Sequence, residues 1–187
     1  MISTADFKNG TVVVLDNELM EIVEFQHVKP GKGGAFVRTR FKNVLTGRVL
    51  DRTFRSGERL EEAELEQQIW QFLYRDGDHF HLMHPETYEQ TVVGADVVGE
   101  GRNWMKENAD VTLVFFRGKV IKVNVPIAVV LRIAKCDLWV QGDRATGGTK
   151  PATLETGVMV QVPLFLSEGD LIKVDTRTGG YIERTSA

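Results

Sequence analysis

The sequence predicts an all-β protein made of three small β-barrel domains. Short runs rich in β-branched and aromatic residues, joined by turn residues, follow one another along most of the 187-residue chain. No succession of long amphipathic helices interrupts them. The pattern breaks at the acidic segment 58–66 and again at Pro126. We therefore expect domains at residues 1–63, 64–127 and 128–187.

In the first domain the turn residues separate four expected strands. Asp16-Asn17 and Leu45-Thr46-Gly47 have the composition of tight turns. The strands are expected at residues 11–15, 19–26, 36–42 and 48–54. Short strands joined this tightly are typical of a small barrel of about 60 residues.

The other two domains are expected to be barrels as well. In the central domain strands are expected at residues 68–74, 80–83, 111–116 and 119–125, and the polar stretch 99–110 as a loop or short helix. In the third domain they are expected at residues 129–134, 138–140, 158–163, 170–174 and 181–184. Five strands with one long loop, at 141–155, suit a Greek-key barrel of the oligonucleotide-binding type.

The loop between the second and third expected strands presents a lysine. It consists of Lys29, Pro30, Gly31, Lys32, Gly33, Gly34 and Ala35. Proline fixes one φ angle, and the glycines permit the positive φ values of a hairpin tip. Lys32 is thus flanked by residues too small to shield it. It is either an ordinary solvated lysine or a group that reaches into another molecule.

Charge is distributed unevenly along a chain whose net charge is −3. Residues 29–59 contain nine basic and two acidic residues, whereas residues 61–127 contain six and twelve. A concentrated basic surface can bind phosphate even on an acidic protein, because fields are screened beyond about 10 Å. A solvated basic sheet face is the alternative.

Two further segments have features of RNA-binding proteins. The glycine-rich stretch 141–151 carries Arg144 and Lys150, and such loops in these barrels contact nucleic-acid backbone through main-chain N–H groups and cations. Near the C-terminus, Tyr181 and Arg184 supply an aromatic ring and a cation that can stack on or clamp RNA. A plain surface loop is the alternative for 141–151.

The sequence contains few patterns typical of catalytic or metal-binding sites. His79, His81 and His84, with Glu86, resemble the HxHxxxxE ligand pattern, since residues two apart on a strand face one side. The alternative is surface and edge-strand histidines. The sequence around Lys32 lacks phosphate-binding-loop spacing, and no catalytic triad is evident. We expect no catalytic residue, metal or cofactor.

No signal peptide or membrane-spanning run is recognisable. The single cysteine, Cys136, lies in an apolar stretch and is expected to be a small buried hydrophobic residue, which fits a reducing cytosol. The expected location is therefore the cytoplasm.

Over essentially its whole length the chain resembles the bacterial elongation factor P family. The strongest segments are residues 29–36 (KPGKGGAF), 88–90 (YEQ), 150–157 (KPATLETG), 162–165 (VPLF) and 172–179 (IKVDTRTG). The resemblance implies an SH3-like (KOW-like) barrel followed by two OB-type barrels in an L-shaped arrangement. It also implies a monomer that binds the 70S ribosome beside peptidyl-tRNA, between the peptidyl and exit sites.

The resemblance assigns roles to individual residues. Lys32 would reach the peptidyl-transferase centre, and a modifying enzyme would extend it with a β-lysyl or aminopentanol group. The family's exit-site codon loop corresponds here to Gly142, Asp143, Arg144, Gly147, Gly148 and Lys150. The expected contacts to tRNA or rRNA phosphate are Arg38, Arg40, Lys42, Tyr181 and Arg184. The histidines have no role in this pattern.

The implied activity is relief of stalling at consecutive prolines. Proline reacts poorly in peptide transfer because its ring restricts the attacking geometry. A factor that holds the peptidyl-tRNA, tRNA-Pro in particular, and positions its CCA end through Lys32 would favour reaction. The alternatives are a general RNA-binding β-barrel protein, a small metal-dependent barrel enzyme, and the elongation-factor-P-like paralogue, whose loop departs from Pro-Gly-Lys-Gly.

Overall fold

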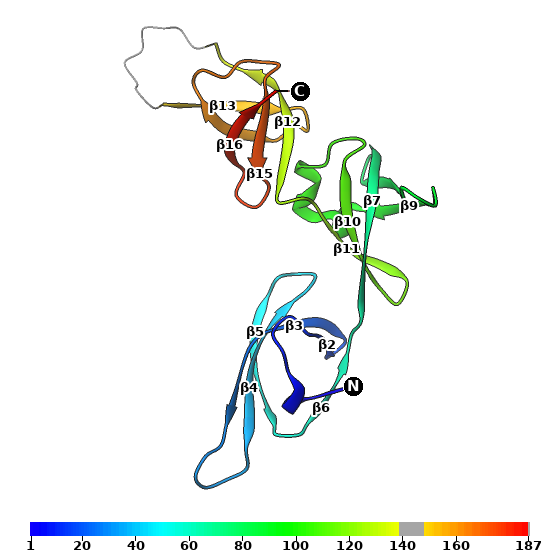
Figure 1. Cartoon of the computed structure of the whole chain (residues 1–187), viewed down its shortest axis with the longest axis vertical. Coiled ribbons are helices and arrows are strands. Elements are labelled where there is room, and N and C mark those ends of the chain that lie inside the picture. Colours follow the sequence, from blue (N-terminus) through cyan, green and yellow to red (C-terminus); the bar gives the residue numbers. More distant parts are fainter. Residues whose placement is uncertain (139–147, 187) are drawn as a thin grey trace. The chain divides into compact units, whose positions relative to one another are not determined.

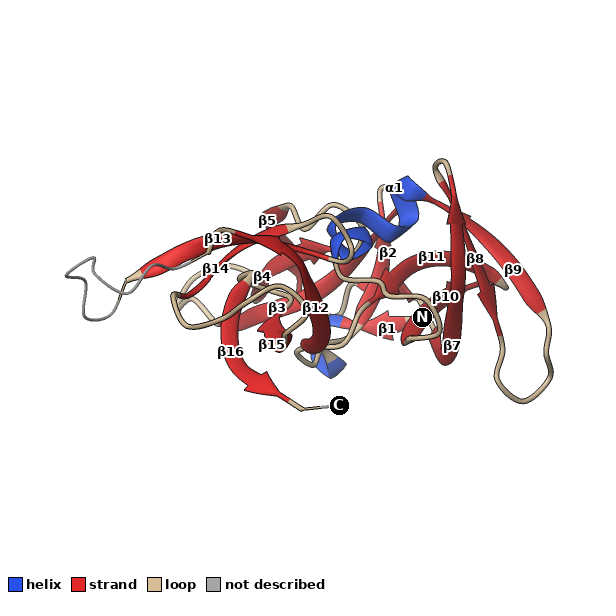
Figure 2. Ribbon diagram, turned by 90° about the horizontal axis from the view of Figure 1, so that it is seen from above, coloured by secondary structure: helices blue, strands red, loops and turns tan. Residues whose placement is uncertain are grey.

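The computed structural model describes residues 1–138 and 148–186. Nearly all of its regular structure is antiparallel β-sheet, arranged as three strongly curved sheets (Figures 1 and 2). The prediction of an all-β fold is confirmed. The chain forms two compact units, one of Met1–Glu66 with Phe115–Ile121 and one of Gln67–Val114 with the chain from Lys122 onward. None of the described helices has the length and apolar character needed to cross a membrane.

The first sheet has six strands in the order β1-β6-β2-β3-β4-β5. The strands are β1 (Ile2–Ser3), β2 (Val12–Leu15), β3 (Glu18–Val28), β4 (Phe36–Asn43), β5 (Val49–Arg55) and β6 (Arg59–Glu62). A short 3₁₀ helix, Thr4–Asp6, follows β1. The turn between β2 and β3 is the expected one, with φ of 51° at Asp16 and 66° at Asn17. Two successive positive φ values are the signature of a two-residue hairpin turn.

Alternation along β4 decides what the first sheet buries. Val37, Thr39 and Phe41 point into the core, whereas Arg38 and the other basic residues of the strand are exposed. The core of this sheet is completed by Phe7, which follows the 3₁₀ helix, and by apolar side chains of the neighbouring strands, chiefly Val13, Met20, Ile22, Phe54 and Leu60. The basic residues that β4 contributes to segment 29–59 therefore lie on the outer, solvent-exposed face of β4.

The second sheet has the order β11-β10-β7-β8-β9. Its strands are β7 (Leu65–Asp76), β8 (His79–Met83), β9 (Gln90–Gly94), β10 (Asp110–Phe116) and β11 (Lys119–Asn124). Between β9 and β10 lie α1 (Ala95–Val98) and the 3₁₀ helix η2 (Gly99–Asn103), within the stretch expected to be a loop or short helix. β9 is absent from the sequence-based expectation because only its central residues are β-branched and the strand is short.

The acidic segment 58–66 contains strands, although the chain passes from the first sheet to the second within it. It contains β6 and the start of β7, with Leu60 and Ala63 buried between exposed glutamates. The acidic composition obscured this strand in the sequence, because charge on the solvent face of a strand carries no information about its pairing. β6 pairs with both β1 and β2.

The third sheet has the order β14-β13-β12-β15-β16. Its strands are β12 (Ala128–Cys136), β13 (Thr149–Leu154), β14 (Met159–Pro163), β15 (Leu171–Asp175) and β16 (Gly180–Thr185). β13 lies where a loop was expected. Pro151 concealed it, since proline is unusual within a strand, but here it sits exposed opposite Gln161. Leu138, expected to begin a strand, is in none, and residues 139–140 lie outside the described part.

Trp104 lies between strands of the second sheet along the chain, but its side chain is buried in the core of the third sheet. Trp104 follows η2 in the second sheet's segment, yet it packs among Leu131, Ile133 and the other buried residues of the third sheet. Its ring also lies under the β15–β16 turn, where a Cβ on Gly179 would come within 3.7 Å of it. The second and third sheets therefore share buried surface, which accounts for their forming one compact unit.

We expect Trp104→Ala to lower the free energy of unfolding of the second unit by about 3–5 kcal/mol, because it removes a large buried side chain and leaves a cavity. Urea unfolding followed by circular dichroism measures this. Phe165→Ala is the matched control, since Phe165 is 61% exposed and its loss should cost less than about 1 kcal/mol. Equal destabilisation by the two variants would contradict this role for Trp104.

Candidate functional site

The lysine tip ends the longest hairpin of the first sheet. β3 and β4 pair from Met20 opposite Asn43 to Val28 opposite Phe36, with one shift of register between Ile22 and Glu24. The seven residues between the strands form the connection, visible in Figure 1 at the end of the β3–β4 ribbon. Lys32 is exposed and has no hydrogen bond or ion pair within the described residues. Its ammonium group is therefore fully available to another molecule.

Glycine is needed at one position of this tip. Gly33 has φ of 114°, a conformation that residues with a Cβ rarely adopt. Pro30 packs near it, and a Cβ on Gly33 would lie 3.8 Å from Pro30 Cγ. Gly31 and Gly34 have no atom within 4 Å of the Cβ position, so their absent side chains leave open space around Lys32. The tip conformation is thus set by Gly33 and its exposure by Gly31 and Gly34.

The three basic residues of β4 differ in how their charge is compensated. Arg40 donates from Nε to Asp51 Oδ1 at 3.0 Å, and its Nη1 lies 3.2 Å from Glu24 Oε2. The hydrogen bond and charge of Asp51, followed by the charge of Glu24, raise the pKa of Arg40 above its ordinary value. Arg38 has no carboxylate partner in the described structure, and its guanidinium lies 5.7 Å from the centre of the Phe36 ring. Lys42 is exposed. Arg38 and Lys42 are the open cations.

The partners of Arg40 were not identified from the sequence. Glu24 and Asp51 flank Arg40 across the sheet, because β3 and β5 pair with β4 at that position. Only the register of three strands brings them together. A groove of about 380 Å³ runs beside these residues, between Arg38 and Arg52.

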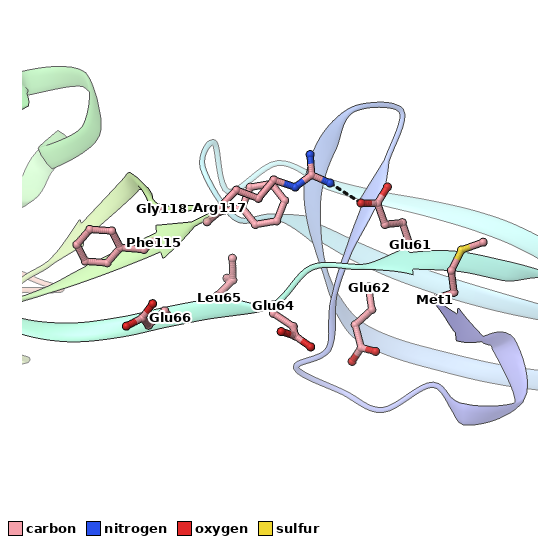
Figure 3. Close-up of a pocket in the computed structure, with 10 residues that line it drawn as sticks. Met1, Glu61, Glu62, Glu64, Leu65, Glu66, Phe115, Arg117 and Gly118 are labelled. Atoms are coloured by element: carbon pink, nitrogen blue, oxygen red, sulfur yellow. Dashed lines mark hydrogen bonds and ion pairs between the residues drawn. The ribbon is translucent and has the colours of Figure 1, made fainter.

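A second groove of the first unit is acidic. It has a volume of about 580 Å³ and is lined by four glutamates from β6, the start of β7 and the residues between them, together with the tip of the β10–β11 hairpin. In Figure 3 the side chain of Arg117 reaches toward Glu61, and its Nη2 lies 2.6 Å from Glu61 Oε1. The remaining carboxylates leave the groove negative, which opposes binding of phosphate.

Tyr181 and Arg184 both lie on β16, where they are engaged with the protein. Tyr181 is half-buried and packs against the core of the third sheet. Arg184 forms an ion pair with Asp170, in which Nη2 lies 2.9 Å from Oδ1, and more than half of the Arg184 side chain is exposed. The aromatic ring and the cation predicted to meet RNA are thus held in fixed positions on one edge strand.

The predicted codon loop falls largely outside the described residues. Gly142, Asp143, Arg144 and Gly147 lie there, whereas Gly148 immediately precedes β13. Lys150 is buried within β13, and its Nζ donates a hydrogen bond of 2.6 Å to the carbonyl oxygen of Asp137. Its ammonium group therefore stabilises the start of the strand, and a contact with RNA would have to replace that bond.

The three histidines have separate environments. His81 stacks on Tyr74 with ring centres 4.3 Å apart, whereas His79 is exposed. His84 Nδ1 accepts hydrogen bonds from the backbone N–H groups of Glu86 and Thr87, at 3.2 and 3.3 Å. Within residues 1–138 and 148–186 no group of three or more ligating side chains is arranged to hold a metal ion.

The turn before β16 is held by a charge pair. Arg177 donates from Nη2 to Asp175 Oδ2 at 2.7 Å and from Nε to Oδ1 at 3.1 Å. These side-chain hydrogen bonds, and then the backbone N–H of Arg177, lower the pKa of Asp175 to about 2. The carboxylate accepts three donors from one residue and so fixes the loop that leads into Tyr181.

We expect Arg177→Gln to raise the pKa of Asp175 toward its ordinary value of about 3.9. Because the folded-state pKa is depressed, the stabilising effect is fully present above about pH 4 and is lost as pH falls through about 2. An NMR titration of the Asp175 carboxyl carbon measures the shift. Lys173→Gln is the control and should leave this pKa unchanged. A pKa still near 2 in Arg177→Gln would mean that another group is responsible.

Comparisons with known proteins give consistent matches along the chain. Residues 3–60 match the elongation factor P (EF-P) KOW-like domain, residues 65–123 the elongation factor P (EF-P) OB domain, and residues 129–184 the elongation factor P C-terminal domain.

Relatives of full length are also similar. Elongation factor P of Desulfitobacterium hafniense (strain DSM 10664 / DCB-2) is 51% identical over 184 residues, covering 98% of this chain and 100% of the relative. That of Clavibacter michiganensis subsp. michiganensis is 51% identical over 186 residues, covering 100% of both. Among solved structures, eukaryotic translation initiation factor 5A from Methanococcus jannaschii has a TM-score of 0.52 at 22% identity, covering 65% of this chain and 94% of that one. This last likeness concerns the fold alone.

Proposed function

The chain belongs to the elongation factor P family and is a translation elongation factor, and from that premise we propose that it binds the 70S ribosome beside peptidyl-tRNA and promotes peptide-bond formation at consecutive prolines. In this role it acts in the cytoplasm as a monomer and needs no catalytic residue, metal or cofactor of its own. The ribosome supplies the reaction centre.

The observation that carries the proposal is the state of Lys32. It is exposed at the end of the β3–β4 hairpin, free of partners in the described structure, and flanked by glycines that leave it unshielded. A lysine that served only the stability of its own domain would make contacts there. The geometry suits a side chain that enters a narrow site belonging to another molecule.

The proposed chemistry is positioning. Proline restricts the approach of the attacking amine, so the reactants spend little time in a productive arrangement. Holding reactants in a near-attack geometry is worth up to roughly 7–11 kcal/mol in model reactions, and a small part of that suffices to relieve a stall. Lys32 would supply this effect by ordering the CCA end of the peptidyl-tRNA, with a covalent extension added by a modifying enzyme lengthening its reach.

The structure suggests which cations hold the RNA. Arg38 and Lys42 lie on the exposed face of β4 without a carboxylate partner among the described residues, whereas the charge of Arg40 is balanced by Glu24 and Asp51. We assign phosphate contacts to Arg38 and Lys42. Arg40 would instead fix the neighbouring strands through its ion pairs with Glu24 and Asp51. Arg184 and Tyr181 supply a second contact in the third sheet, and residues 142–148 a third, at the exit-site codon.

We expect Lys32→Ala to abolish rescue of a reporter that encodes three consecutive prolines, while translation of a proline-free reporter stays unchanged. Translation in cells lacking the native protein, complemented with each variant, measures this. Lys8→Ala, which removes another exposed lysine of the first unit, is the control and should rescue fully. Full rescue by Lys32→Ala would reject the role of the tip and favour a general RNA-binding protein. Intact-mass measurement of the native protein shows whether Lys32 is extended.

We expect Arg38→Gln to weaken binding to ribosomes carrying peptidyl-tRNA and to lower the slope of log affinity against log salt by about 1, as loss of one phosphate contact does. Arg48→Gln removes the same charge from the connection between β4 and β5, at a residue paired with Glu18, so it serves as the control. A similar loss in both variants would mean that the total charge of the sheet, and not Arg38, governs binding.

A further inference from the structure

The second unit has a groove that the proposed function leaves unused. Its volume is about 460 Å³, and none of the residues predicted to contact RNA lines it. Its walls come from β7 and β8, from η2 and the segment that follows it, and from the turn between β13 and β14. All of these belong to one compact unit. The volume lies in the range of small-molecule sites and far exceeds that of a single ion.

Cations gather in this groove although the surrounding segment is acidic. Residues 61–127 contain six basic and twelve acidic residues, and three of those six, Arg75, Arg102 and Lys106, line it. They come from two segments separated by more than 25 residues, so only the fold brings them together. A random distribution over an acidic surface would not concentrate half of the cations in one groove.

The three cations are available to different degrees. Arg75 is held in place, since its Nε donates to the carbonyl oxygen of Gly77 at 2.6 Å and its guanidinium lies 5.3 Å from the centre of the Phe80 ring. Its Nη2 also lies 3.8 Å from Asp78 Oδ1, which compensates part of its charge. Lys106 Nζ lies 3.3 Å from Glu155 Oε1. Arg102 is exposed and has no hydrogen bond or ion pair within the described residues. Both guanidinium groups line the groove, and guanidinium groups bind oxyanions through charge-assisted hydrogen bonds.

A hydroxyl group in the same groove lacks a partner. Thr156 lines the groove, and its Oγ1 is buried with no hydrogen bond in the described structure. A buried hydroxyl without a partner costs about 1–3 kcal/mol. An oxygen atom of a bound ligand would accept the hydroxyl proton and remove that cost.

The carboxylates near the groove pair with two of its three cations. Asp78 Oδ1 lies 3.8 Å from Arg75 Nη2, and Glu155 Oε1 lies 3.3 Å from Lys106 Nζ and also accepts the backbone N–H of Arg132 at 2.8 Å. Glu107 lines the groove as well and is exposed. Arg102 is therefore the lining cation that has no carboxylate partner among the described residues, and it is the first candidate to bind an anionic group.

We propose that this groove binds a phosphate group carried by a ligand of nucleotide size. Arg75 and Arg102 hold the phosphate oxygens, Thr156 Oγ1 donates to one of them, and Lys106 completes the positive wall. The same chemistry is offered by a phosphodiester of single-stranded RNA and by a free mononucleotide. The site is independent of the lysine tip, since it lies in the other compact unit.

The test is titration of the full-length ¹⁵N-labelled protein, without ribosomes, at low salt. Three probes are compared: inorganic phosphate, AMP and a single-stranded hexanucleotide RNA. We expect saturable shifts of the amide signals of residues 102–108 and 155–156. Tighter binding of the hexanucleotide identifies RNA as the source of the phosphate, and equal or tighter binding of AMP identifies a free nucleotide.

Two variants and a matched control make the assignment specific. Arg102→Gln should weaken binding of the preferred probe at least tenfold, whereas Lys135→Gln, which removes one exposed charge of the same unit outside the groove, should change it less than twofold. Thr156→Val should weaken binding several-fold without lowering the melting temperature of the free protein, because it deletes a hydroxyl that has no partner.

Absence of saturable binding by all three probes would overturn the proposal. So would equal losses in Arg102→Gln and Lys135→Gln, since they would show binding to the general charge of the unit. Neither result bears on Lys32, whose role is read from the proline reporter.

Discussion

The antiparallel pairing of β3 with β4 is the constraint on which the candidate site depends. Side chains alternate across a strand, so the register that places Val28 opposite Phe36 also decides which face carries Val37 and Phe41 and which carries Arg38. A shift of one residue would bury the arginine and expose the apolar pair. Burial of the apolar face thus holds the hairpin in one register, and the hairpin carries Lys32 beyond the core. Stability and presentation of the tip have the same physical origin.

Whether a charged side chain of this protein can bind a partner depends on its local ion pairs, which the composition alone does not reveal. The basic residues of β4 look equivalent in the sequence, yet Arg40 is neutralised by Glu24 and Asp51 while Arg38 is not. The first unit also holds an acidic groove in which Arg117 is bound to Glu61. The acidic groove and the basic strand therefore present opposite potentials within a single unit. A phosphate-bearing partner has one face to approach and one to avoid.

The second and third sheets form one compact unit because they share buried surface. Trp104 is supplied by the segment after η2 and is buried among residues of the third sheet, so neither sheet completes its packing alone. η2 itself contributes Arg102 to the groove and the segment after it contributes Lys106, together with Glu155 and Thr156 of the β13–β14 turn. Joining the two sheets through Trp104 therefore also builds the groove. The position of a core residue and the placement of a candidate binding site are linked through one stretch of chain.

The sequence by itself determined the all-β character, most of the strands, the Asp16-Asn17 turn and the glycine-flanked Lys32, because each follows from local propensity, alternation or backbone freedom. It did not reveal β13 or β6, where a proline and a run of glutamates mask strands that exist through pairing with distant partners. Nor did it reveal that Lys150 is buried and bonded to Asp137. Only the tertiary structure decided which cations are open and which hydroxyl lacks a partner, since both depend on neighbours that are remote along the chain and adjacent in space.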